Sequence, residues 1–201
     1  YYLKSNEKLD EYKKYLCGEL SKEALYSMVP EVVLKSVIHQ TMSEENMSEL
    51  FDLINELKKE QHIKQIDLIV GGPPCQAYSL VGRAVKSDNM VGDPRNYLYK
   101  LYIEVLKKYT PTMFVFENVP GLLTANEGKY FKDMKNAFED AGYTIDHSVL
   151  NARNFDVLQD RRRVILIGWK KELKYFYPIF EEKTSSHTVA DLLSDLPAIQ
   201  S

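Results

Sequence analysis

The spacing of apolar and polar positions divides the first third of the chain into short helical segments. Between residues 6 and 25, apolar side chains recur at helical spacing among charged ones, which predicts one amphipathic helix. Met28-Val29-Pro30 interrupts this pattern. Residues 31–40 contain a dense apolar group that fits either a short strand or a buried helical turn. Ser43 is a candidate N-cap for a further helix that runs to Leu57.

Strand-length apolar runs and helical patterns alternate in the rest of the chain. The run that starts at Ile66 is β-branched and continuous, so we expect a buried parallel strand covered on both faces. The last two strands are joined by a loop too short for a helical crossover and are therefore expected to pair antiparallel. Alternation of this kind predicts an α/β layer fold. The expected strands are 66–70, 113–116, 143–152 and 163–169, and the expected helices are 96–109, 129–141 and 187–196.

The first strand stops at Gly71-Gly72-Pro73-Pro74, and Cys75 follows at once. The glycines allow a tight turn and a close approach to the backbone, and the prolines stiffen the exit. Ligands bind at the carboxyl ends of strands in open α/β sheets, so Cys75 is a candidate nucleophile there. A buried structural cysteine is the alternative, which we favour for Cys17 in its amphipathic helix.

Polar groups also stand at the ends of two other expected strands. Glu117 follows an apolar run and is expected at the same sheet edge as Cys75. Its carboxyl group there can donate a proton or hold a protonated ring nitrogen, or it can cap the next turn instead. Asn118 is expected to help fix that turn. Arg161 and Arg163 point to one side of an entering strand, where they can grip a phosphate or carbonyl oxygen, unless they form an exposed basic cluster.

Composition narrows the function classes. The 201 residues suffice for one domain with a core, or one domain and part of another. A net charge of −3 argues against the chain as a whole acting as an electrostatic binder of nucleic acid. Two cysteines make no disulfide framework, which predicts a cytoplasmic, reducing environment. No apolar run has membrane-spanning length, so no membrane partner is expected, and no metal-ligand set is predicted.

Together these motifs resemble the DNA (cytosine-5)-methyltransferase family. Pro73-Pro74-Cys75-Gln76 matches its catalytic loop, Glu117-Asn118-Val119 its glutamate motif, and Gln159-x-Arg161-x-Arg163 its arginine motif. Residues 93–98, Asp-Pro-Arg-Asn-Tyr-Leu, match the segment after the catalytic loop. The motifs occur in the family's order, and the resemblance extends over residues 65–196.

The resemblance implies a fold: the doubly wound, mostly parallel, Rossmann-like sheet of S-adenosylmethionine-dependent methyltransferases, with an antiparallel hairpin at its C-terminal end. Residues 1–187 would form the catalytic methyltransferase domain, in part. Residues 188–201 would lead into a target-recognition domain. The family's Phe-x-Gly-x-Gly cofactor loop and its target-recognition region are not visible. We therefore expect a chain that is truncated at both ends or divergent in its first part, and inactive by itself.

The resemblance also implies an activity: methyl transfer to C5 of cytosine in double-stranded DNA, with S-adenosylmethionine as cofactor, in a restriction–modification system. Cys75 would add to C6 of a flipped cytosine, and Glu117 would hold N3. Arg163 would contact the O2 side of the base, and Arg161 would hold the loop or a phosphate. Pro74 and Leu98 match positions beside the cofactor.

Further residues are assigned to the DNA side of the site by the same resemblance. Gln76, Ser79 and Arg83 lie on a loop expected to close over DNA, and Gln159 opens the arginine motif. A cognate restriction endonuclease is a second candidate partner. Two alternatives stay open from the sequence: the tRNA-modifying branch of the same family, and a DNA-binding relative without catalytic activity.

Overall fold

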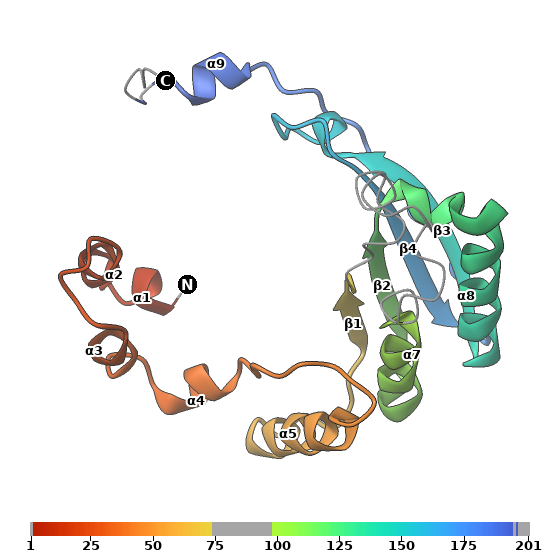
Figure 1. Ribbon diagram of the computed structural model, residues 1–201, viewed down its shortest axis with the longest axis horizontal. Coiled ribbons are helices and arrows are strands. Elements are labelled where there is room, and N and C mark those ends of the chain that lie inside the picture. Colours follow the sequence, from red (N-terminus) through yellow and green to blue (C-terminus); the bar gives the residue numbers. More distant parts are fainter. Residues whose placement is uncertain (1, 74–97, 195, 197–201) are drawn as a thin grey trace. The chain divides into compact units, whose positions relative to one another are not determined.

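The structure is a computed structural model that describes residues 2–73, 98–194 and 196. The chain forms two compact units, Tyr1–Lys64 and Gln65–Ser201 (Figure 1). None of the helices in the described ranges has the length and apolar character needed to cross a bilayer. The proposed division into residues 1–187 and 188–201 stays a prediction.

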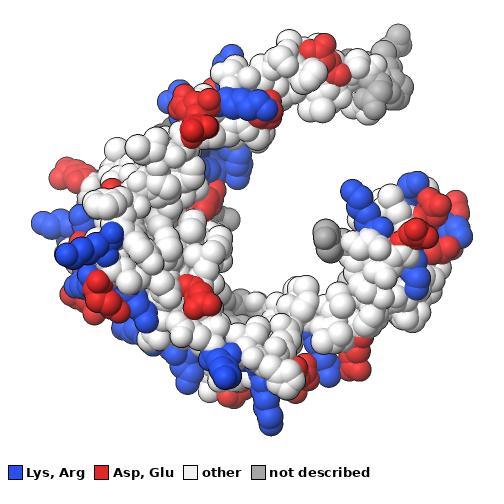
Figure 2. All heavy atoms as spheres, turned by 180° about the vertical axis from the view of Figure 1, so that it is seen from behind, with Lys and Arg blue, Asp and Glu red and all other residues white. Residues whose placement is uncertain are grey.

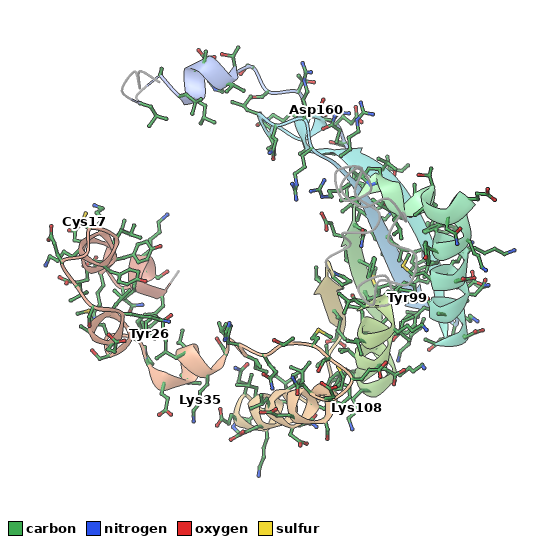
Figure 3. The ribbon with its side chains drawn as sticks, viewed as in Figure 1. Cys17, Tyr26, Lys35, Tyr99, Lys108 and Asp160 are labelled. Carbon is green, nitrogen blue, oxygen red and sulfur yellow. The ribbon has the colours of Figure 1, made fainter. Side chains whose placement is uncertain are left out.

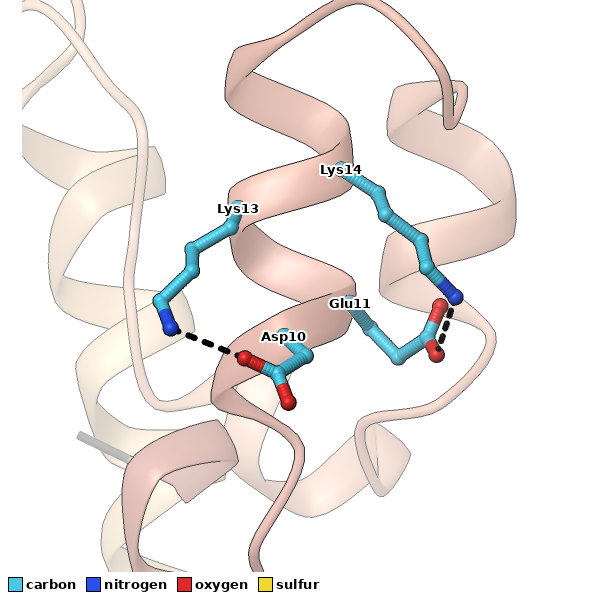
Figure 4. A network of polar contacts seen from close by, with 4 residues as sticks. All are labelled: Asp10, Glu11, Lys13 and Lys14. Atoms are coloured by element: carbon cyan, nitrogen blue, oxygen red, sulfur yellow. Dashed lines mark hydrogen bonds and ion pairs between the residues drawn. The ribbon is translucent and has the colours of Figure 1, made fainter.

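The first unit is helical throughout its described part. The single helix expected over residues 6–25 is divided, because Gly18 has a positive φ of 77° between two shorter helices. Two ion pairs lie on the surface of the first of these helices, Asp10–Lys13 and Glu11–Lys14, and each joins residues three positions apart (Figure 4). The helices are α1 (Tyr2–Ser5), α2 (Leu9–Leu16), α3 (Lys22–Tyr26), α4 (Glu31–Lys35) and α5 (Met47–Glu60).

Two expectations for this unit are resolved by the structure. The ambiguous segment at residues 31–40 contains the short helix α4, which has no buried residue. The proposed N-cap at Ser43 is wrong: α5 begins at Met47, with Asn46 in the N-cap position. The Ser43 hydroxyl oxygen is instead buried without a hydrogen-bond partner among the described residues.

The second unit is built on a four-stranded mixed sheet in the order β1-β2-β4-β3 (Figure 1). β1 (Leu68–Gly71) pairs parallel with β2 (Met113–Asn118), and β2 pairs antiparallel with β4 (Arg162–Lys170). β3 (Tyr143–Asn151) and β4 form the expected antiparallel hairpin, which is confirmed. The remaining elements are α7 (Leu98–Tyr109), η2 (Pro120–Leu123), η3 (Ala125–Gly128), α8 (Lys129–Asp140), η4 (Ala152–Asn154) and α9 (Val189–Leu192).

The core lies between the sheet and helices α7 and α8. Alternate residues of β2, Phe114 and Phe116, are 0% and 2% exposed and point to this layer, as the period of a strand requires. Phe138 of α8 packs against both rings, and Tyr102 of α7 meets them edge-on. These helices therefore take their position from the aromatic face of β2.

The outer face of β1 differs from the sequence-based expectation. Leu68 and Val70 are 53% and 68% exposed, whereas Ile69 between them packs against the core. Within the described residues, β1 pairs on one side only and forms an edge of the sheet. The expectation of a strand covered on both faces is therefore wrong for this side of β1. Continuous apolar character cannot by itself distinguish a central strand from an edge strand, because burial depends on what packs outside it.

The buried Tyr102 fixes α7 to the two parallel strands. Its hydroxyl oxygen lies 3.1 Å from the carbonyl oxygens of both Ile69 in β1 and Val115 in β2. Its ring lies over Gly71, where an added Cβ would come within 2.6 Å of a ring carbon. Burial raises the pKa of Tyr102, so the group stays a neutral hydrogen-bond donor across the physiological range.

Gly168 of β4 lies against the core with no room for a side chain. It pairs with Phe114 across the sheet, and an added Cβ would overlap that buried ring. We predict that Gly168→Ala lowers the free energy of unfolding by about 1–3 kcal/mol, because the packed ring must shift. Urea unfolding measures the change. Thr144→Ala, on the exposed side of β3, serves as the control and should change stability by less than about 0.5 kcal/mol. A Gly168→Ala variant as stable as the control would contradict this packing.

Candidate active site

Glu117 lies inside a strand rather than after it. β2 continues two residues beyond the expected end at Phe116, and Glu117 pairs with Ile165 of β4. The strand alternation turns Glu117 away from the aromatic layer, and 40% of its side chain is exposed. The carboxylate is thus held on regular backbone at the carboxyl end of β2 and remains accessible to solvent.

Arg163 is the partner of this carboxylate. Its Nε lies 2.7 Å from Oε1 of Glu117, and its Nη1 donates a hydrogen bond of 2.7 Å to the carbonyl oxygen of Arg162. Only 23% of the Arg163 side chain is exposed, so it does not belong to a solvated basic cluster. The two motifs, 46 positions apart in sequence, meet because β4 runs antiparallel to β2 and brings its first residues to the last residues of β2.

The alternative role for Glu117, capping the next turn, is wrong. The neighbouring Asn118, and not Glu117, contacts the residue that precedes this turn: its Oδ1 accepts a hydrogen bond of 2.9 Å from the backbone N–H of Val119. Asn118 therefore fixes the turn, as expected, and leaves the Glu117 carboxylate to Arg163. A negative and a positive group, both partly exposed, are left side by side at the sheet edge.

The residues that follow β1 pass directly against Glu117 and Asn118. An added Cβ on Gly72 would lie 2.9 Å from Oε2 of Glu117, so the backbone there approaches the carboxylate closely. The Nδ2 of Asn118 donates a hydrogen bond of 3.4 Å to the carbonyl oxygen of Pro73. The contact between Asn118 and Pro73 was not predicted from the sequence. The strand pattern indicates the burial of Asn118, because a period of two places it on the buried face with Phe114 and Phe116.

The rest of the arginine motif precedes β4 in the chain. Arg161 is exposed and precedes β4, and its backbone N–H donates to Oδ1 of Asn151. Gln159 is exposed on the loop between β3 and β4, next to Asp160 (Figure 3). β4 begins at Arg162, so Arg161 directly precedes the strand, and the expectation that Arg161 and Arg163 act from one side stays a prediction. Gln159, Asp160 and His187 line a surface hollow of about 350 Å³.

The remaining candidates divide into two groups. Leu98 is the first residue of α7 and is half-buried. Pro74, Cys75, Gln76, Ser79 and Arg83 lie outside the described residues. Cys17, expected to be a buried structural cysteine, is exposed after the end of α2 (Figure 3), so that expectation is wrong. Helical spacing alone does not reveal whether another part of the protein packs over a helix, so it could not predict the exposure of Cys17.

Charge on the described surface is mixed. In the space-filling view, acidic and basic side chains lie interspersed, without a large patch of one sign on the face shown (Figure 2). This distribution agrees with the small net charge of −3. Recognition of a polyanion by this face would have to rely on individual residues rather than on a broad field.

The mixed α/β sheet and the glutamate–arginine ion pair at its strand ends agree with the class that the motifs imply, the S-adenosylmethionine-dependent cytosine-C5 methyltransferases. The family model described as C-5 cytosine-specific DNA methylase matches residues 33–200. The chain therefore belongs to this family, whose methyl donor is S-adenosylmethionine. The resemblance drawn from the motifs is confirmed.

Named relatives agree with this assignment. The chain is 36% identical over 229 aligned positions to the Type II methyltransferase M.Bpa9945I of Bacillus paralicheniformis, with 100% of the chain and 52% of the relative covered. It is 39% identical over 140 positions to the Type II methyltransferase M.XorII of Xanthomonas oryzae pv. oryzae, covering 69% and 31% of the two chains. The chain thus spans about half, or less, of these relatives.

A solved structure is similar as well. It is a crystal structure from E. coli described as a DNA modification methyltransferase encoded within a prophage. The TM-score is 0.54 at 30% identity, and the match covers 72% of this chain and 39% of the other. The fold of the second unit is therefore one that this family uses.

The Glu117–Arg163 ion pair should contribute little to stability. Both side chains keep contact with solvent, which screens their attraction. In a double-mutant cycle of Glu117→Gln and Arg163→Gln, we predict a coupling energy of about 0.5–1 kcal/mol in urea unfolding, falling as salt increases. The pair Lys107 and Glu104 on α7, with both side chains 54% exposed, provides a reference cycle. A coupling of several kcal/mol that is insensitive to salt would show instead that the pair is a structural element.

Proposed function

We propose that the protein containing this chain transfers a methyl group to C5 of cytosine in double-stranded DNA. The observation that carries the proposal is the Glu117–Arg163 pair, whose carboxylate lies against the backbone of Gly72, three residues before Cys75. A thiol, a carboxylate and a guanidinium in this order along the chain suit covalent activation of a pyrimidine ring. The target base would be turned out of the duplex to reach them.

The chemistry assigns one role to each residue. The Cys75 thiolate adds to C6, and the electron pair of the 5,6 double bond makes C5 nucleophilic. Glu117 supplies or holds a proton at N3, so that negative charge does not accumulate in the ring. C5 would take the methyl group as the bond from that group to the sulfur of the cofactor breaks. The C5 proton would then pass to water, and its electron pair would re-form the 5,6 double bond as the bond from the Cys75 sulfur to C6 breaks. Arg163 holds the O2 side of the base, next to Glu117.

The cofactor fits the described residues only in part. S-adenosylmethionine supplies an electrophilic methyl group when bound. Leu98, half-buried at the start of α7, offers an apolar flank for a ring system at the sheet edge. Pro74 is the second residue that we assign to this side. Within the described ranges we identify no further residues for the nucleoside, and none of the steps above depends on them.

DNA is the favoured substrate over tRNA, and an enzyme over a binding module. The relatives at 36% and 39% identity are both named Type II methyltransferases. Their names also support a restriction–modification system, in which a cognate endonuclease would be a partner. A binding module has no chemical use for a carboxylate, paired with a guanidinium, against the Gly72 backbone that precedes Cys75 in the chain. With DNA as the proposed substrate, the proposed site of action is the cytoplasm.

We predict that Cys75→Ala abolishes methyl transfer and leaves DNA binding intact. The experiment uses the longest open reading frame that encodes this chain, and an oligonucleotide duplex with 5-fluorocytosine in place of the target cytosine. The wild-type protein should form a covalent adduct that survives denaturing electrophoresis, because fluorine cannot leave as a proton does. Cys17→Ala is the matched control and should form the adduct normally. Methyl transfer by Cys75→Ala at the wild-type rate would refute the mechanism.

Glu117→Gln should lower kcat by about 10²–10⁴-fold, because an amide cannot supply the proton at N3. Fold and DNA affinity should change little, since the side chain is partly exposed and keeps its shape. Tritiated methyl transfer and filter binding on the same preparations separate the two effects. Glu104→Gln on α7 is the control for loss of one surface carboxylate. Equal losses in binding and turnover would assign Glu117 to DNA binding rather than to the chemistry.

A further inference from the structure

Asn118 is the one buried side chain in the described ranges that carries an amide or a charge. It is 5% exposed at the end of β2, on the face that also carries Phe114 and Phe116. A carboxamide in this layer costs free energy unless its hydrogen-bonding groups are satisfied. Capping the turn at Val119 uses only the oxygen. The question is therefore what the nitrogen does.

The nitrogen bonds to the segment that leads to Cys75. Nδ2 donates to the carbonyl oxygen of Pro73 at 3.4 Å, across from β2 to the exit of β1. The two prolines at positions 73 and 74 have no backbone N–H, so this segment can be held by its peptide groups only through its carbonyl oxygens. Asn118 supplies a donor where the chain itself offers none.

Glu117 also restricts the space around the start of this segment. The backbone at Gly72 lies against the Glu117 carboxylate, where an added Cβ would be 2.9 Å from Oε2. Two consecutive residues of β2 therefore contact two consecutive residues of the β1 exit, Glu117 at Gly72 and Asn118 at Pro73. Cys75 follows two residues later.

We propose that Asn118 is a positioning residue that holds the base of the Cys75 loop at a fixed place relative to Glu117. This rests on the proposed function, in which Cys75 and Glu117 must reach the same pyrimidine ring. An error of about 1 Å in such an arrangement can cost about 10²-fold in rate. A purely structural role, confined to the turn at Val119, needs only the oxygen of Asn118.

Asn118→Asp separates the two roles. The variant keeps the acceptor for the N–H of Val119 and the shape of the side chain, but an ionised carboxylate has no donor for the Pro73 carbonyl. Burial and the facing carbonyl oxygen raise the pKa of the introduced carboxyl group. When protonated, it regains one O–H donor, so lowering the pH should restore the contact. Asn136→Asp, the same change at an exposed position of α8, is the matched control.

The expected result is a loss of about 10–100-fold in single-turnover methyl transfer by Asn118→Asp at pH 8, with DNA affinity within about twofold of wild type. Adduct formation with 5-fluorocytosine should slow to the same degree. The activity relative to Asn136→Asp should rise as the pH is lowered to 6, with both proteins folded by circular dichroism. If Asn118→Asp does not fold at pH 8, Asn118→Ser, which keeps a hydroxyl for Val119, is measured in its place and should show the same loss of kcat without loss of affinity.

Other outcomes have distinct meanings. Wild-type rates in Asn118→Asp, or a ratio to Asn136→Asp that does not change with pH, overturn the positioning role while the proposed function stands. Loss of rate together with an equal loss of DNA affinity also overturns it, because a misplaced nucleophile leaves binding intact. A wild-type protein that forms no adduct and transfers no methyl group removes the proposed function, and the positioning role with it.

Discussion

The close approach of two parallel strand ends is the constraint on which the rest of the site depends. Where β1 leaves the sheet, the ring of Tyr102 occupies one face and the Glu117 side chain the other. A side chain at Gly71 would meet the ring, and one at Gly72 would meet the carboxylate. The two glycines are therefore required by packing from opposite sides, and the nucleophile loop begins at a backbone that is confined on both.

Electrostatics at this edge serves chemistry more than stability. The Glu117–Arg163 pair is short, but both side chains retain solvent contact, which limits what it contributes to folding. A carboxylate and a guanidinium held on adjacent strands are already in place when a polar ring arrives beside them. The aromatic layer formed by β2, α7 and α8 supplies the rigidity instead, because it fixes the strands that carry both groups.

The family match and the structure support each other, the first over most of the chain and the second at a few residues. The family model covers residues 33–200, whereas the motifs that carry the chemistry are short and lie at the ends of β1, β2 and β4. The chain spans about half, or less, of the named relatives described above. The chain contains the part of the fold in which the ends of β1, β2 and β4 lie together.

The sequence by itself determined the alternation of strands and helices in the second unit, the antiparallel hairpin, and the residue types of the site. Local periodicity and motif order are enough for these, because each depends on neighbours in the chain. Three features depended on tertiary structure: the exposure of Leu68 and Val70, the exposure of Cys17, and the bond from Asn118 to Pro73. Each of these depends on which segment packs against which. Apolar character shows that a side chain is able to be buried, but the partner that buries it, or leaves it exposed, comes from elsewhere in the fold.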